Sequence, residues 1–182
     1  MGWIVLGIIS LVVIGLITGY NTLVSLKKRV ENAWSQIDVQ LKRRYDLIPN
    51  LIEVAKGYLA HERNVLENVT KARNQAISAE GVKAQAEAEN FLTQSLRSLF
   101  AVVENYPDLK ANQNMLTLHE ELTSTENKIA FARQYYNDEV MRLNTTINSF
   151  PTNLIANWFR FSPSEFFEIE DLSHREAPKV KF

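Results

Sequence analysis

The sequence predicts an all-α protein that begins with an apolar helix. Apolar residues recur three and four positions apart over most of the 182 residues, which is the spacing of one face of a helix. The strict alternation of apolar and polar residues that is typical of a half-buried strand is not found in the sequence. Residues 3–26 add an apolar run without a charged residue. These observations together predict one membrane helix followed by amphipathic helices.

The apolar run over residues 3–26 predicts a transmembrane helix. At ~1.5 Å per residue it reaches about 36 Å, which exceeds the ~30 Å hydrocarbon core of a bilayer. Trp3 and Tyr20 flank its most apolar part, where amphipathic rings favour the headgroup region. The alternative is a cleaved secretory signal. No Lys or Arg precedes the run and no Ala-x-Ala pattern follows it, so we favour a retained anchor.

The residues around the run predict its orientation and a possible contact within the membrane. Lys27, Lys28 and Arg29 follow directly, and positive charge accumulates on the cytoplasmic side of membrane helices. We therefore expect an N-terminus outside and a cytoplasmic helical body over residues 27–151. Gly15 and Gly19 are four residues apart, a spacing that lets two membrane helices approach closely, although glycine is also common in unpaired spans. They are our candidates for membrane pairing.

The first amphipathic helix is predicted over residues 22–46, continuous with the membrane helix. Asp46 and Pro49 mark a predicted helix junction. Proline clashes with the preceding turn and lacks the amide that would bond the carbonyl of Tyr45, so the chain should kink or begin a new helix there. The basic run, defined as Lys42, Arg43 and Arg44, is a candidate for binding membrane lipid or a partner's carboxylate. A solvated helix face is the alternative reading.

Three further helices are predicted at about residues 49–78, 82–105 and 109–148. Gly81 and the residues around Pro107 separate them, because glycine and proline interrupt helical patterns. The last helix would be about 60 Å long at ~1.5 Å per residue, longer than its neighbours, so part of its apolar stripe should contact another chain. Residues 152–182 are predicted to form a short helix and an aromatic tail that packs on the bundle or the membrane.

Composition and motifs give no support to enzyme chemistry. The net charge of -1 argues against nucleic acid as a main partner, and the absence of cysteine excludes disulfides and thiolate metal sites. His61 and His119 each precede a glutamate, but neither belongs to a His-Glu-x-x-His motif. We therefore expect no catalytic residue, no metal and no cofactor.

Several segments resemble one protein family across nearly the whole chain. They include YNTLVSLKKRVENAWSQIDVQLKRRYDLIPNLIEVAKGY (residues 20–58), YPDLKAN (106–112), EELTSTENKIAFARQYYNDEVMRLNTTINSFP (120–151) and the ending FFEIED with Arg175, Pro178 and Phe182. The chain resembles the LemA family of bacterial membrane proteins. This resemblance implies one span in the bacterial plasma (inner) membrane and a cytoplasmic antiparallel four-helix bundle. The family has no established reaction, and one relative takes part in forming magnetosome membranes.

These observations lead to two functional hypotheses. The preferred one is a non-enzymatic, membrane-anchored helical scaffold that forms a homo-oligomer and organises or shapes the membrane. The alternative is an adaptor or regulatory subunit for another membrane protein, such as a protease or a sensor. Neither hypothesis includes an enzymatic activity. In the scaffold hypothesis the partner is a second copy of the chain, and in the adaptor hypothesis it is a different protein.

Overall fold

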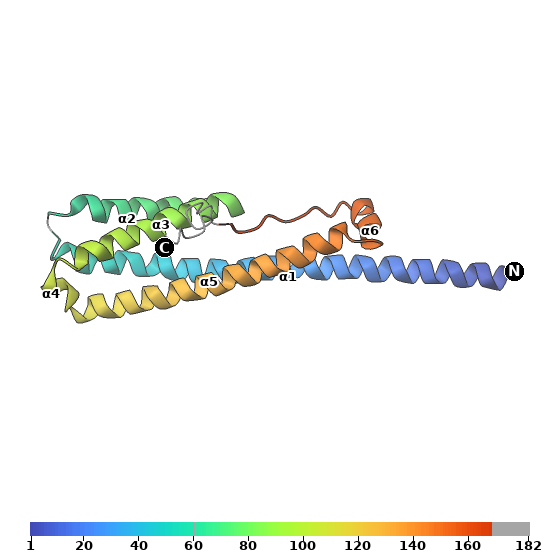
Figure 1. Cartoon of the computed structure of the whole chain (residues 1–182), viewed down its shortest axis with the longest axis horizontal. Helices are drawn as coiled ribbons and strands as arrows, with labels where there is room; N and C mark the ends of the chain where they lie inside the picture. The colour runs from blue at the N-terminus through green and yellow to red at the C-terminus, as the bar shows by residue number, and fades with distance from the viewer. Residues whose placement is uncertain (60, 169–182) are drawn as a thin grey trace, which may run out of the picture. The chain divides into compact units, whose positions relative to one another are not determined.

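The computed structural model describes residues 1–59 and 61–168, and these residues are mostly helical (Figure 1). The elements are α1 (Gly2–Lys56), α2 (Arg63–Ile77), α3 (Val82–Val103), α4 (Pro107–Lys110), α5 (Gln113–Asn148) and α6 (Thr152–Trp158). None of the described residues lies in a strand, so the all-α prediction is confirmed. They form two compact units. The first comprises residues 1–41 and 126–166, and the second comprises 42–125 with the described residues after 166.

Helix α1 does not end at the predicted junction of Asp46 and Pro49. It continues through Pro49 to Lys56. The structure supplies the reason: Arg73 Nε on α2 donates a hydrogen bond of 2.7 Å to the Tyr45 carbonyl, the group that Pro49 cannot serve. Of the two predicted alternatives at Pro49, the start of a new helix is wrong, because α1 continues through this residue. A hydrogen bond from a neighbouring helix replaces the missing one within α1.

The chain reverses after Lys56 instead, which divides the helix predicted over residues 49–78. The amides of Tyr58 and Leu59 both donate to the Ala55 carbonyl, at 3.0 and 2.9 Å, and close the end of α1. Leu59 is buried beside them. Helix α2 begins only at Arg63. The sequence pattern missed this turn because the apolar stripe continues on both sides of it.

The later boundaries lie close to the predicted ones. Gly81 precedes α3 with φ of 86°, a left-handed conformation that favours glycine. Helix α5 begins at Gln113 rather than at 109, because Asn112 caps it: the Asn112 side-chain oxygen accepts the amides of Asn114 and Met115 at 2.9 and 3.2 Å. Pro107 opens the separate short helix α4.

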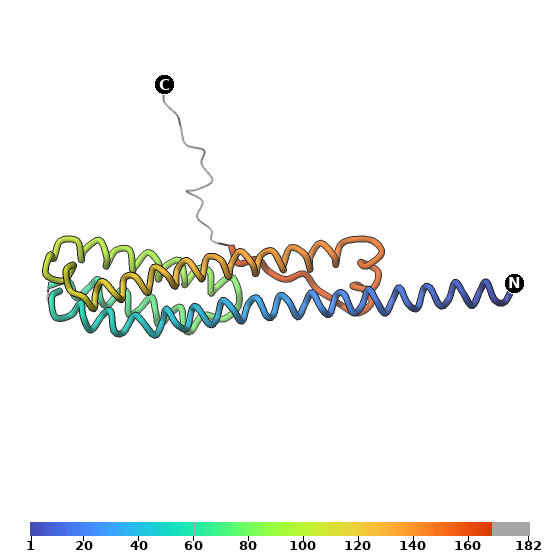
Figure 2. The backbone as a smooth tube through the Cα atoms, turned by 90° about the horizontal axis from the view of Figure 1, so that it is seen from below, coloured from blue at the N-terminus to red at the C-terminus, as the bar shows by residue number. Residues whose placement is uncertain are grey.

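The second unit has one continuous hydrophobic core. Figures 1 and 2 show α2 and α3 beside the C-terminal part of α1 and the N-terminal part of α5. Each of these helices contributes to the core at helical spacing, as the apolar stripes predicted. The core residues are Ile48, Leu51, Ile52, Ala55, Leu59, Leu66, Val69, Ala72, Ala76, Ala88, Leu92, Leu96, Leu99, Val103, Leu109, Met115 and Leu122.

The first unit joins the N-terminal part of α1 to the C-terminal part of α5 and to α6. Ile155 of α6 packs so closely on Gly19 that a Cβ at that position would clash with the Ile155 Cδ1. After α6 the chain runs along α5 to residue 166 (Figure 2). The Asn144 side chain exchanges two hydrogen bonds with the backbone of Ser164, of 2.9 and 2.8 Å. Tyr136 donates to the Glu165 carbonyl at 2.9 Å.

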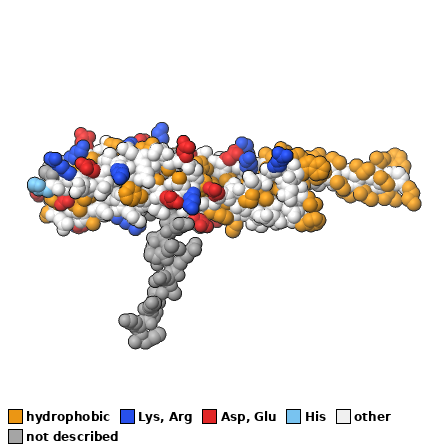
Figure 3. All heavy atoms as spheres, turned by 90° about the horizontal axis from the view of Figure 1, so that it is seen from above, with side chains coloured by type: hydrophobic (Ala, Val, Ile, Leu, Met, Phe, Trp, Pro, Cys, Tyr) orange, Lys and Arg blue, Asp and Glu red, His pale blue; other side chains and the backbone are white. Residues whose placement is uncertain are grey.

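The start of α1 is apolar and exposed. Helix α1 is long and apolar enough to cross a membrane, and none of its most apolar stretch is buried in the described structure. Figure 3 shows these apolar side chains gathered along the start of the helix. A core helix of a soluble protein would bury such residues, so a membrane anchor or a signal sequence explains the exposure.

We expect a double-mutant cycle to detect the replacement of the missing hydrogen bond. Arg73→Met should lower the free energy of unfolding by about 1–3 kcal/mol, because the Tyr45 carbonyl loses its partner. In a Pro49→Ala background the same change should cost less, because alanine, unlike proline, supplies a helical amide to that carbonyl. Urea unfolding of the detergent-solubilised chain, followed by circular dichroism, measures both. An equal cost in the two backgrounds would reject this explanation.

Candidate functional site

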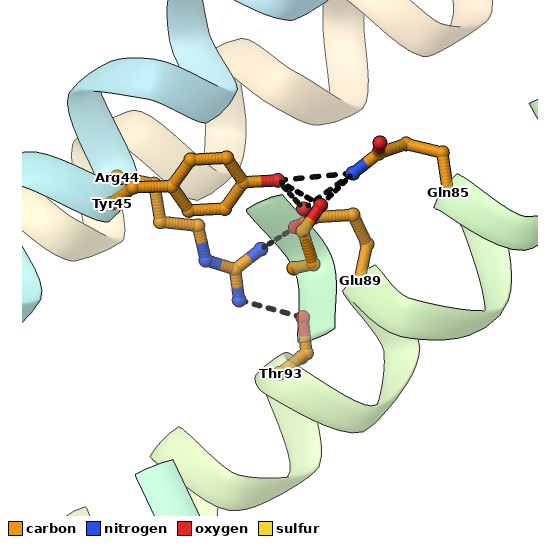
Figure 4. Close-up of polar contacts among 6 residues, drawn as sticks. Arg44, Tyr45, Gln85, Glu89 and Thr93 are labelled. Carbon is orange, nitrogen blue, oxygen red and sulfur yellow. Dashed lines mark hydrogen bonds and ion pairs between the residues drawn. The ribbon is translucent and has the colours of Figure 1, made fainter. Parts of the chain in front are cut away.

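A polar cluster lies inside the core of the second unit. It consists of Arg44 and Tyr45 from α1 and Gln85, Glu89 and Thr93 from α3 (Figure 4). The Arg44 and Glu89 side chains are 3% and 0% exposed, and Arg44 Nη1 lies 3.1 Å from Glu89 Oε2. Arg44 Nη2 donates a second hydrogen bond, of 2.7 Å, to the Thr93 hydroxyl. A buried charge pair is stable only with such additional hydrogen bonds.

The other carboxylate oxygen of Glu89 accepts from two further side chains. The Tyr45 hydroxyl donates to Glu89 Oε1, and Gln85 Nε2 lies 3.1 Å from the same oxygen. Gln85 Nε2 also lies 3.1 Å from the carbonyl of Ala76 on α2. Both oxygens of the buried carboxylate are therefore hydrogen-bonded, and the cluster connects three helices.

The electrostatics fix the protonation of Tyr45. Burial raises the pKa of its hydroxyl far above the usual value, and the Glu89 carboxylate raises it further. The phenol therefore remains protonated at neutral pH and acts as a hydrogen-bond donor. The cluster suits a connection between helices, because the Arg44, Tyr45 and Gln85 side chains all donate hydrogen bonds to the Glu89 carboxylate.

The structure divides the basic run. Lys42 and Arg43 are exposed, whereas Arg44 is buried in the polar cluster. The partner carboxylate of Arg44 is Glu89 of the same chain. Arg44 is therefore removed from the predicted surface for lipid or partner binding. Binding by Lys42 and Arg43 stays a prediction.

The two membrane-pairing candidates have different surroundings. Gly15 has open space where a side chain would lie, whereas Gly19 receives Ile155 of α6. The missing side chain of Gly19 thus serves packing within this chain. Pairing of two copies through this face stays a prediction, and Gly15 is the position that tests it without disturbing α6.

An open groove on the first unit was missed by the sequence patterns. Its volume is about 650 Å³. Phe131 and Val39, on α5 and α1, line it and are 72% and 64% exposed, and Tyr135 lies one helical turn after Phe131. The remaining lining residues are Asn32, Ser35, Gln36, Gln40, Lys128 and Ala132. The sequence signal for this groove was the pair Phe131 and Tyr135, two large apolar residues four positions apart beside the buried stripe of α5.

The described residues offer no metal centre. Within residues 1–59 and 61–168, no group of three or more His, Asp or Glu side chains comes together to hold an ion. His119 packs against Phe100, with ring centroids 4.3 Å apart, and His61 is exposed.

We expect Glu89→Gln to destabilise the chain strongly. The change leaves the Arg44 charge buried without its carboxylate, which costs about 3–5 kcal/mol in comparable buried pairs. Replacing both partners, Arg44→Met with Glu89→Leu, should restore most of the free energy of unfolding, because neither charge then remains in the core. Thermal and urea unfolding measure the three proteins. A double variant as unstable as Glu89→Gln would contradict the charge-pair explanation.

Tyr45 should make stability fall at alkaline pH. Its folded-state pKa lies above the unfolded value of about 10, so the folded state holds the proton more tightly. Its stabilising contribution is complete below about pH 10 and is lost as pH rises above that value. Tyr45→Phe should therefore show a smaller fall in melting temperature between about pH 9 and pH 11 than the wild type. Equal slopes would show that Tyr45 contributes nothing to this loss.

Comparisons with known proteins identify the family. Magnetosome protein MamQ 2 of Paramagnetospirillum magneticum is 24% identical over 84% of this chain and 66% of its own length. MamQ of Magnetospirillum gryphiswaldense is 22% identical over 84% and 65%. Protein LemA of Metamycoplasma hominis is 28% identical over 75% and 63%. The chain thus spans slightly less than two thirds of the length of these relatives. Because the LemA family model matches residues 33–182, this chain belongs to the LemA family.

Proposed function

We propose that this protein is a non-enzymatic, membrane-anchored helical scaffold that self-associates and organises or shapes the membrane. Its body would be an antiparallel four-helix bundle on the cytoplasmic side of the bacterial plasma membrane, with the N-terminus outside. One observation carries this proposal. Helix α1 is apolar and exposed in its first part, yet the same helix is part of the folded core from Leu23 onward.

The exposure of α1 supports a membrane as its surroundings. Exposing a large aliphatic side chain to water rather than burying it costs about 1.5–3 kcal/mol, and α1 exposes a long series of them. A bilayer removes this cost along the whole run. The helix also supports a retained anchor over a cleaved signal, because Gly19 and Tyr20 pack against Ile155 and Phe159 of the folded unit. Cleavage near the end of the run would remove part of that unit.

The groove of the first unit supports self-association. Phe131 and Val39 expose apolar surface on two adjacent lengths of helix, and a third helix could fill the space between them. The proposed orientation follows Lys27, Lys28 and Arg29, which come directly after the apolar run. The relatives named magnetosome proteins extend the proposal, by analogy, to organising a membrane.

The adaptor remains the second candidate, and the composition of the groove favours it. Polar side chains such as Gln36 and Lys128 line the groove beside the apolar ones. Mixed surfaces of this kind are typical of non-obligate interfaces. A helix of another membrane protein would then occupy the site that the scaffold hypothesis gives to a second copy.

We expect Phe131→Glu to disrupt self-association. A carboxylate in the lining of the groove would lose hydration when a partner helix packs there. Leu116→Glu is a matched control, since Leu116 is another exposed apolar residue of α5 outside the groove. Native mass measurement and lysine crosslinking of the chain in nanodiscs should show oligomers for the wild type and the control, and mainly monomers for Phe131→Glu.

Two outcomes would overturn the scaffold proposal. The first is a wild-type chain that stays monomeric over a broad range of concentration. The second is a wild type that is captured from membranes with one stoichiometric foreign protein, and loses it on Phe131→Glu. The second result would establish the adaptor in place of the scaffold.

A further inference from the structure

Three large apolar side chains are exposed in α6 and just before it. Leu154 and Trp158 are four residues apart and share one face of this helix, while Ile155 and Ala156 are buried. Phe150 stands just before the helix. The exposed fractions are 80% for Phe150, 61% for Leu154 and 81% for Trp158. We call these three residues the α6 apolar face.

Contacts within the first unit fix α6 at one level of α1. Ile155 packs on Gly19, where the missing Cβ lets the two helices approach closely. The Tyr20 ring lies 4.7 Å from Phe159 and 5.9 Å from Phe161, measured between ring centroids. Figures 1 and 2 both show α6 beside α1. The α6 apolar face therefore lies near the level of Gly19 and Tyr20.

That level coincides with the end of the apolar part of α1. Trp3 and Tyr20 are separated by about 25 Å along the helix at ~1.5 Å per residue, close to the thickness of the ~27–30 Å hydrocarbon core. The first charged residues, Lys27 and Lys28, follow Tyr20 by about 10 Å at the same rise. If Trp3 lies at one surface of the bilayer, Tyr20 lies at the other.

We propose that the α6 apolar face inserts into the headgroup region of the bilayer that α1 crosses. Tryptophan favours this region, because the region accepts both its apolar ring and its polar N–H group. Phenylalanine and leucine are common on the apolar face of helices that lie at the membrane surface. Exposed Arg160 follows α6 and supplies a cation suited to lipid phosphate. This inference rests on the proposed anchoring by α1 and adds a second contact between chain and membrane.

A lipid surface fits the α6 apolar face better than a second copy does. The face continues the exposed apolar surface of α1, which ends beside it. Three such side chains bury at most about 500–700 Å² of one copy, whereas a stable protein interface of standard size buries about 800 Å² on each partner. A bilayer needs no minimum area, because α1 already holds the chain there. The second contact would restrict rotation of the first unit about the axis of α1.

Single-tryptophan proteins in vesicles test this inference. The full chain contains Trp3, Trp34 and Trp158, so phenylalanine at two of them leaves the third as reporter. The control reporter is Val39→Trp with all three native tryptophans changed to phenylalanine, because Val39 is exposed on α1 well beyond Tyr20. Each protein is reconstituted in vesicles of phosphatidylcholine and phosphatidylglycerol whose acyl chains are brominated either near the headgroup or deep in the bilayer.

We expect Trp158 emission to fall about twofold or more with shallow bromine and less with deep bromine, as for a ring at the interface. Trp3 should also be quenched, and Val39→Trp should not. Trp158 that is unquenched while Trp3 is quenched would overturn the inference and leave the anchor intact. A blue-shifted but unquenched Trp158 would place a protein on the face and overturn it too. An unquenched Trp3 would instead reject the anchoring by α1 on which the inference rests.

Discussion

The hydrogen bond from Arg73 Nε to the Tyr45 carbonyl lets α1 continue through Pro49. Without a donor for that carbonyl, a proline at this position would favour a break in the helix. With it, one helix supplies the exposed apolar run, the buried side of the first unit and one wall of the core of the second.

The same turn of α1 also carries the polar cluster. Arg44 and the Tyr45 hydroxyl engage Glu89 on α3, while the Tyr45 carbonyl engages Arg73 on α2. Two adjacent residues of α1 therefore contact both α2 and α3. Buried ion pairs often add little net stability compared with apolar packing, so a specific alignment of α1 against α2 and α3 explains the cluster better. A slip of α1 along its neighbours would separate each of these pairs.

The sequence was sufficient for α3 and α5, and insufficient for the turn after Lys56 and for the long-range partners of the helices. Local apolar spacing predicts α3 and α5 nearly to their ends, and Gly81 marks a real turn. Pro49 misled the prediction because its compensating donor is 28 residues away from Tyr45, and Arg44 was assigned to the surface because its carboxylate is 45 residues away. Gln85 and Glu89 interrupt the apolar side of α3 at helical spacing. This interruption was the available sequence signal for a buried polar cluster. Part of the predicted tail, residues 169–182, lies outside the described residues. This part includes Arg175, Pro178 and Phe182.

Amide hydrogen exchange along α1, resolved by residue in the full chain in lipid nanodiscs, tests the continuity of this helix most directly. The continuous helix predicts that the amides of residues 50–53 exchange as slowly as those of residues 37–41. It also predicts protected amides over the apolar run, where the bilayer surrounds the helix. Exchange at the rate of an unfolded peptide from Asp46 to Glu53 would contradict it, since two separate helices would then meet at Pro49.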